Sequence, residues 1–170
     1  VYISAQAIGG AHHPLYLFDK EKRAKQITPE QGELCRKGLL DYVNSYTDEV
    51  MNRISEQTFE LSKKWEEDGV DNMDFIGDGA DYATAFFGSA KMVEAFGGLT
   101  TNDDSEDWLH INAWIKDTDH IGTFIIANAD SPCFNRELET IKVACELRKH
   151  VCVISDADRK LFPQSATVIN

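Results

Sequence analysis

The chain has 170 residues, 42% of them apolar, which is enough to bury one substantial core. Its 29 acidic and 17 basic residues give a formal net charge of −12, which disfavours nucleic acid and anionic membranes as partners because both would repel it. We therefore expect its partners to be small molecules or other protein chains.

The first residues, VYISA (1–5), have the pattern of a strand, and a loop punctuated by Gly, His and Pro follows them. His12 and His13 lie in this loop, but no third ligand follows at a useful spacing, so we expect no metal site there. The chain begins without Met inside an apolar run and ends in another, ATVIN (166–170). We expect it to be a piece of a longer protein.

Thr28, Pro29 and Glu30 mark the start of a helix. A hydroxyl caps the free backbone amides, proline suits the first turn, and an acid favours this end of a helix. Apolar residues then recur at helical spacing from Leu39 to Trp65, which predicts one long helix or two consecutive ones. The segment EEDGVDN (66–72) interrupts the pattern, and we place the start of the main domain there.

Beyond this boundary strands and helices alternate. The predicted strands are MDFIG (73–77), GTFIIAN (122–128), VCVIS (151–155) and the run 166–169, and the predicted helices are 82–96, 132–149 and a further one beginning near Ser105. Near-continuous apolar strands between helices predict an α/β fold, a three-layer sandwich in which a mostly parallel, flavodoxin-like sheet is flanked by helices. Ligands of such sheets bind at the carboxyl ends of the strands, where Gly77, Asn128 and Ser155 would lie.

The turn after the first of these strands contains Gly77 and Gly79, a pattern that can cradle an anion. A dinucleotide fingerprint would need a third glycine where Tyr82 stands, and no Gly-Lys-Ser/Thr follows to form a P-loop. A tight strand-to-helix turn without a ligand is an equally good interpretation of the spacing. In the following helix Lys91 and Glu94 stand three residues apart, which by itself indicates a surface ion pair.

The order GDGADYATAFFGSAKMVEAFGG (77–98), an acidic turn, and DWLHINAW (107–114) resembles a SIS (sugar isomerase) domain. The resemblance is to the second such domain of glucosamine-6-phosphate synthases and fructosamine-6-phosphate deglycases. In that family a strand ends in a Gly-x-Gly turn, an aromatic follows, and the next helix carries a Gly-Ala-x-Lys-x-x-Glu-like motif. Here that motif is GSAKMVE (88–94).

The resemblance implies the functional residues. The family's catalytic glutamate maps onto Glu94, and its catalytic histidine, which lies in a Glu-x-x-His-Gly-Pro turn, maps onto His110, 16 residues downstream. Asp107 takes the place of the acid of that turn. The implied substrate-binding residues are Gly77, Gly79, Asp81, Asp107 and Asn128, and no cofactor or metal is implied.

Three departures from the family pattern bear on the substrate. The turn reads His110-Ile111-Asn112 instead of His-Gly-Pro, and only Ser131 lies near the place of the family's Ser/Thr-rich phosphate loop. The region is also rich in acidic residues, namely Asp81, Asp103, Asp104, Glu106 and Asp107. An amine-bearing substrate would tolerate this charge better than a bare sugar phosphate, which favours deglycase or amino-sugar chemistry.

The resemblance also implies the organisation and the activity. Residues 1–27 would be the tail of a preceding SIS domain, 28–70 a helical connector, and 71–170 an incomplete second SIS domain. Glu94 would move protons between neighbouring carbons of a phosphosugar and His110 would open its ring. The family's histidine usually reaches into the neighbouring subunit's site, so we expect a homodimer or higher homo-oligomer.

Two other functions stay open. SIS domains also serve as non-catalytic phosphosugar-binding modules of regulators, and the His-Ile-Asn turn favours this alternative. The chain would otherwise be a purely structural acidic module that dimerises through its helical connector. The four cysteines, scattered at 35, 133, 145 and 152, predict neither a zinc site nor disulfides, and with no signal peptide and no membrane-spanning run they favour a cytoplasmic protein.

Overall fold

The computed structural model describes residues 27–170, and the chain divides into two compact units, Val1–Ser55 and Glu56–Asn170. The strand predicted at residues 1–5, the His12-His13 pair and nearly all of the predicted tail, 1–27, lie outside the described residues.

The predicted connector is helical. Helix α2, Pro29–Asn44, begins with the predicted cap: the Thr28 hydroxyl accepts from the backbone of Gln31, and the Gln31 side chain accepts from the backbone of Thr28. A second helix, α3, spans Asp48–Glu67 and crosses from the first unit into the second. Of the two arrangements that the sequence allowed, the structure has two consecutive helices.

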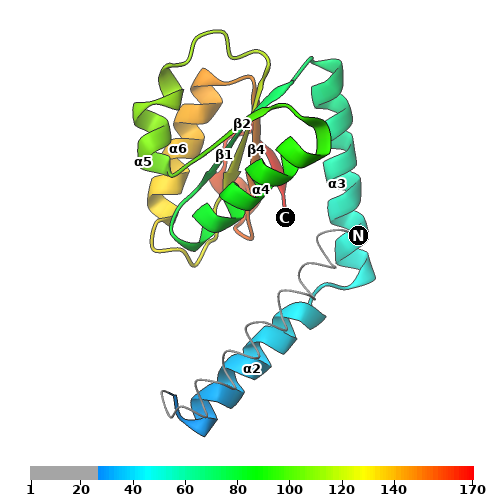
Figure 1. Cartoon of the computed structure of the whole chain (residues 1–170), viewed down its shortest axis with the longest axis vertical. Coiled ribbons are helices and arrows are strands. Elements are labelled where there is room, and N and C mark those ends of the chain that lie inside the picture. Colours follow the sequence, from blue (N-terminus) through cyan, green and yellow to red (C-terminus); the bar gives the residue numbers. More distant parts are fainter. Residues whose placement is uncertain (1–26) are drawn as a thin grey trace. The chain divides into compact units, whose positions relative to one another are not determined.

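The second unit is built on a five-stranded, fully parallel sheet with the strand order β2-β1-β3-β4-β5 (Figure 1). The strands are β1 (Asn72–Gly77), β2 (Leu99–Asp103), β3 (Ile121–Ile126), β4 (His150–Ile154) and β5 (Thr167–Ile169). The α/β sandwich predicted from the alternation of apolar strands and helices is confirmed.

Helices cover both faces of the sheet (Figure 1). Helix α4, Ala80–Phe96, and the part of α3 from residue 56 onward cover one face, and helices α5, Ser105–His110, and α6, Phe134–Leu147, cover the other. The core residues agree with this arrangement. Phe75 packs with Ala85 of α4, whereas its strand neighbour Ile76 packs with Trp108 of α5, because successive side chains of a strand point to opposite faces.

The sequence prediction missed one strand, β2. Its residues, LTTND, have little apolar character, and two of the five are exposed. Within residues 27–170 the strand pairs only with β1, so it forms an edge of the sheet. A short polar edge strand of this kind lacks the apolar run by which the other strands are recognised.

Candidate functional site

The carboxyl ends of β1, β3 and β4 meet at one edge of the sheet, as predicted. Gly77 of β1 pairs in register with Ile126 of β3, and Ile126 pairs with Ile154 of β4. Residues 78–81, 127–131 and 155–158, which follow these three strands, therefore gather at this edge.

The two glycines of the first turn serve different purposes. A Cβ on Gly77 would lie 2.5 Å from the carbonyl oxygen of Asp81, so this glycine is required by the close approach of the chain's own helix. Gly79 has φ +56° and ψ −117°, a conformation that side-chain-bearing residues avoid, and a Cβ there would meet no atom within 4 Å. The backbone geometry thus accounts for Gly77 without a ligand.

Two of the predicted substrate-binding residues are brought together at this edge. The backbone amide of Asn128 donates to Oδ2 of Asp81 at 3.3 Å. Burial raises the pKa of Asp81, as do the nearby carboxylates of Asp156 and Asp78, and the bond from Asn128 offsets this in part.

Asp78 links the end of β1 to the start of α5 through hydrogen bonds. It is buried, and its carboxylate accepts from the backbone amide of Ser105 at 3.1 Å and from the Ser105 hydroxyl. Because Ser105 is the first residue of α5, this pair fixes where that helix begins.

The sequence interpretation did not include Glu137, a fully buried carboxyl of α6. Burial, together with the neighbouring charges of Asp78 and Asp81, raises its pKa to about 7. Its Oε1 accepts from the hydroxyl of Ser131 at 3.4 Å, and its Oε2 has no hydrogen-bond partner within residues 27–170. A sequence signal existed: Glu137 occupies the helical stripe whose other members, Thr140, Ile141 and Ala144, are buried against the sheet.

Glu94, the predicted catalytic acid, lies near the other end of α4. With about 1.5 Å of rise per residue, it lies about 20 Å along the helix from Gly79. Its side chain is 67% exposed, and its Oε2 is 2.7 Å from Nζ of Lys91. An exposed pair of this type is held weakly, so the carboxylate is free to exchange partners. Glu94 is therefore remote from Gly77, Gly79, Asp81 and Asn128 within one chain.

His110, the predicted catalytic histidine, is the last residue of α5, and its side chain is 69% exposed. Its Nδ1 lies 2.8 Å from the carbonyl oxygen of Glu106. A carbonyl only accepts, so Nδ1 carries a proton in this contact, and in the neutral imidazole the lone pair is then on Nε2. Asp107 is exposed one turn earlier in α5, and its backbone amide donates to the capping carboxylate of Asp104.

A buried polar network holds the segment that carries His110. Asp74 of β1 accepts from the indole of Trp108 at 3.1 Å, and it lies 3.7 Å from the guanidinium of Arg148. Arg148 stacks on the Trp108 ring, 5.4 Å from its centroid, and donates to the carbonyl of Asn112. Asn112, which takes the place of the proline in the His-Gly-Pro pattern, is buried, and its side-chain amide donates to Asp103 at 2.6 Å.

Glu94 and His110 belong to helices on opposite faces of the sheet. A single chain therefore does not bring them together. The structure unites Asp81 with Asn128, and Asp107 with His110, as two separate groups.

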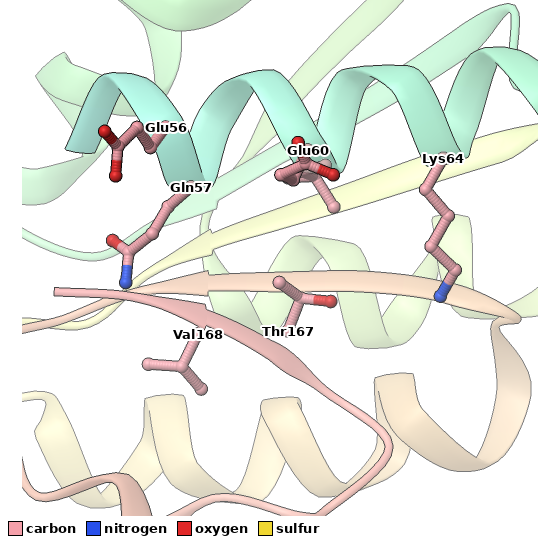
Figure 2. A pocket seen from close by; sticks show the side chains of 7 residues that line it. Glu56, Gln57, Glu60, Lys64, Thr167 and Val168 are labelled. Atoms are coloured by element: carbon pink, nitrogen blue, oxygen red, sulfur yellow. The ribbon is translucent and has the colours of Figure 1, made fainter. Parts of the chain in front are cut away.

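An open groove of about 430 Å³ lies between α3 and the edge strand β5 (Figure 2). It is lined by Glu56, Gln57, Glu60, Leu61, Lys64, Thr167 and Val168, none of which is a predicted site residue. In residues 27–170 no group of three or more His, Cys, Asp or Glu side chains is arranged to hold a metal ion. Within the same range, no helix has the length and apolar character needed to cross a bilayer.

Comparison with known proteins shows the fold. No protein-family profile matches the chain, and no curated protein matches its sequence. Among solved structures, the C-terminal domain of glucosamine-fructose-6-phosphate aminotransferase from Francisella tularensis matches with a TM-score of 0.73 and 13% identity, over 91% of this chain and 42% of that one. A phosphosugar isomerase assigned as putative, from Clostridium difficile 630, matches with a TM-score of 0.70 and 17% identity, over 88% of this chain and 40% of that one.

Tagatose-6-phosphate ketose/aldose isomerase from Escherichia coli also matches, with a TM-score of 0.54 and 13% identity, over 71% of this chain and 34% of that one. The chain thus spans less than half the length of each of these three structures. Together they show that the chain has a SIS-like fold, as its resemblance to that family implied.

Proposed function

We propose that this SIS-like chain belongs to a sugar-phosphate isomerase or fructosamine-6-phosphate deglycase that acts through Glu94 and His110 of two different chains. The similar solved structures include proteins described as phosphosugar isomerases, which supports the substrate class. The excess of acidic residues favours an amine-bearing phosphosugar over a bare sugar phosphate.

The proposal rests on one observation: the side chains of Glu94 and His110 are both exposed, and they lie on opposite faces of the sheet. Glu94 lies beside exposed apolar side chains, Val93 and Phe96, and His110 lies beside Ile111 and Trp114, the latter 78% exposed. Exposed apolar side chains that cluster together mark surfaces that other proteins cover. Two such surfaces, one around each group, support an assembly in which the acid of one chain meets the imidazole of another.

The chemistry follows from the two groups. A carboxylate beside two neighbouring carbons removes a proton from one and returns it to the other through an enediol, which is the role proposed for Glu94. The sugar ring must first open, and the imidazole of His110, with a lone pair on Nε2, would take the hydroxyl proton and protonate the ring oxygen. On a fructosamine phosphate the same proton transfer would give an imine of the amine and the aldose phosphate, and hydrolysis of that imine by water would release the amine and a sugar phosphate.

The experiment is turnover of a fructosamine 6-phosphate by the full protein, with released amine and sugar phosphate both measured. Glu94→Gln and His110→Ala should each lower kcat by about 100-fold or more, as expected when a general acid or base is lost. Glu146→Gln, an exposed glutamate of α6, is the matched control and should retain full activity. Full activity of both site variants would remove the proposal.

Asn112 favours a second candidate, a non-catalytic phosphosugar-binding module. Arg148 donates to the backbone carbonyl of Asn112, and the side-chain amide of Asn112 donates to Asp103, so the turn after His110 has a structural role of its own. A module of this kind would be stabilised by a phosphosugar, seen as a thermal shift, but would leave it chemically unchanged.

A further inference from the structure

Helix α5 carries His110 but is too short to hold its own position. It has six residues, Ser105–His110, and a helix of this length is not stable without tertiary contacts. The hydrogen bond of the His110 ring, from Nδ1 to the carbonyl of Glu106, lies within α5 itself. The place of the imidazole relative to the sheet therefore depends on the contacts that fix α5 and the turn after it.

Arg148 contacts the chain on both sides of His110. Its guanidinium lies over the ring of Trp108, two residues before the histidine, with 5.4 Å between the guanidinium carbon and the ring centroid. Its Nη2 donates to the backbone carbonyl of Asn112, two residues after the histidine. The same carbonyl also accepts from the amide of Ile115 at 3.1 Å, so this turn is held by two donors.

These contacts belong to a closed set of polar groups, which we call the Arg148 network: Asp74, Thr101, Asn112 and Arg148. The hydroxyl of Thr101 donates to Asp74 at 3.1 Å, and the side-chain amide of Asn112 donates to the same hydroxyl at 3.2 Å. The carboxylate of Asp74 lies 3.7 Å from the guanidinium of Arg148, which closes the set. Because each member contacts two others, the turn at Asn112 is tied to strands β1 and β2.

Packing alone does not account for Arg148. Its side chain is completely buried, yet its Nε and Nη1 have no hydrogen-bond partner within residues 27–170. Buried donors without partners cost free energy, and a buried ion pair is often less stable than apolar residues of similar size. A costly group of this kind is expected where a role other than stability determines the residue.

We propose that Arg148 is a positioning residue that holds the imidazole of His110 in place through Trp108 and Asn112. The inference rests on the proposed function, in which this imidazole takes and returns protons of the sugar. Displacing a catalytic group by about 1 Å can slow a reaction by about 100-fold. Loss of Arg148 should therefore lower kcat and leave KM nearly unchanged, because the residues that bind the substrate keep their places.

The test uses Arg148→Lys in the full protein. Lysine keeps a positive charge beside Asp74, but it lacks the plane that stacks on an indole and the fork of donors that reaches a carbonyl. On a fructosamine 6-phosphate, kcat should fall by about tenfold or more, with KM changed by less than about twofold.

NMR of the imidazole nitrogens gives a second readout that needs no turnover. The His110 signals are identified by their absence from His110→Ala. At pH 8 the unaltered chain should carry the His110 proton on Nδ1, as the contact with Glu106 requires. In Arg148→Lys the end of α5 should loosen, and the proton should then be found on either nitrogen.

Arg159→Lys is the matched control. Arg159 also donates to backbone carbonyls, those of Phe162, Pro163 and Ala166, but it belongs to the segment after β4 and lies outside the Arg148 network. Its substitution should lower the melting temperature and leave kcat and the His110 signals unchanged. An equal change of the His110 signals in Arg159→Lys would overturn the proposal, because lower stability alone would then explain the effect.

The double variant Asp74→Asn, Arg148→Met serves if Arg148→Lys does not fold. It removes both buried charges together, so neither is left without its partner. It should change the His110 signals in the same way. Unchanged His110 signals and unchanged kcat in a folded variant would overturn the positioning role and leave the proposed reaction standing. The expected change of these signals, without turnover by the unaltered chain, would support the positioning and count against the proposed reaction.

Discussion

Asp74 is a carboxylate in the middle of a buried strand, and it organises the polar network below α5. It accepts from Thr101 at 3.1 Å and from Trp108 at 3.1 Å, and it lies 3.7 Å from the guanidinium of Arg148. Burial lowers the pKa of Arg148 and the charge of Asp74 raises it, so the two groups depend on each other.

Asp74→Ala should therefore lower the free energy of unfolding by about 3 kcal/mol or more, because it leaves the charge of Arg148 buried without its partner. Urea unfolding measures this change. Asp71→Ala, an exposed acid just before the same strand, is the control and should change stability by less than about 0.5 kcal/mol. A loss below about 1 kcal/mol for Asp74→Ala would show that the network is not held as described.

Glu137 makes stability depend on pH. The pKa of its carboxyl rises from an ordinary 4.5 to about 7 in the folded chain, so the folded state binds more protons than the unfolded state between these values. Stability should then fall as pH rises through this window, by at most about 3 kcal/mol.

Glu137→Gln cannot lose a proton there, so it should be more stable than the unaltered chain at pH 8 and nearly equal to it at pH 4. Thermal unfolding of both proteins across this range measures the difference. Parallel curves, with a constant difference at every pH, would contradict the raised pKa of Glu137.

At the scale of elements, the turn from β1 to α4 is the most constrained connection of the sheet. Gly77→Ala should cost about 3 kcal/mol of stability, because its Cβ would lie 2.5 Å from the backbone oxygen of Asp81 and the helix would have to shift. Gly79→Ala should cost about 1–2 kcal/mol, from backbone strain alone.

Gly38 in α2 is the control for these two substitutions. A Cβ there meets no atom within 4 Å, and alanine is the better helix former, so Gly38→Ala should be neutral or stabilising. Denaturant unfolding of the three variants checks the order. Equal losses for Gly77→Ala and Gly79→Ala would show that close packing of the helix on Gly77 is not the cause.

The sequence predicted most elements because their signals are local. The cap at Thr28, the apolar strands β1, β3 and β4, and the helix beginning at Ser105 all follow from neighbouring residues. Strand β2 was not predicted because its residues are polar. They form an edge strand, and the sequence does not show which segments will lie at the edge of the sheet. The role of Glu137 was not predicted for a related reason. Its pKa is raised by burial and by carboxyl groups that are distant from it in the sequence, and both depend on the folded structure.

The candidate site, like the fold, was predicted from the sequence only in part. The sequence predicted that Gly77, Asn128 and Ser155 would lie at the carboxyl edge of the sheet, and they do. Spacing along the chain does not reveal that Glu94 and His110 lie on opposite faces, because that depends on which side of the sheet each helix packs.

One proposed catalytic group lies on each side of the sheet of the second unit. Glu94 emerges from the layer formed by α3 and α4, and His110 from the layer formed by α5 and α6. If the two act together, they must come from different chains, so activity should require an assembly. A chain kept monomeric should then be folded and inactive.

Mixing two inactive variants tests this central claim most directly. Glu94→Gln and His110→Ala should each be inactive on a fructosamine 6-phosphate. After subunits are exchanged in equal amounts, about a quarter of the original activity should return, since half of the dimers are mixed and one of their two sites is intact. No recovery after confirmed exchange, or full activity of either variant alone, would contradict a site shared between two chains.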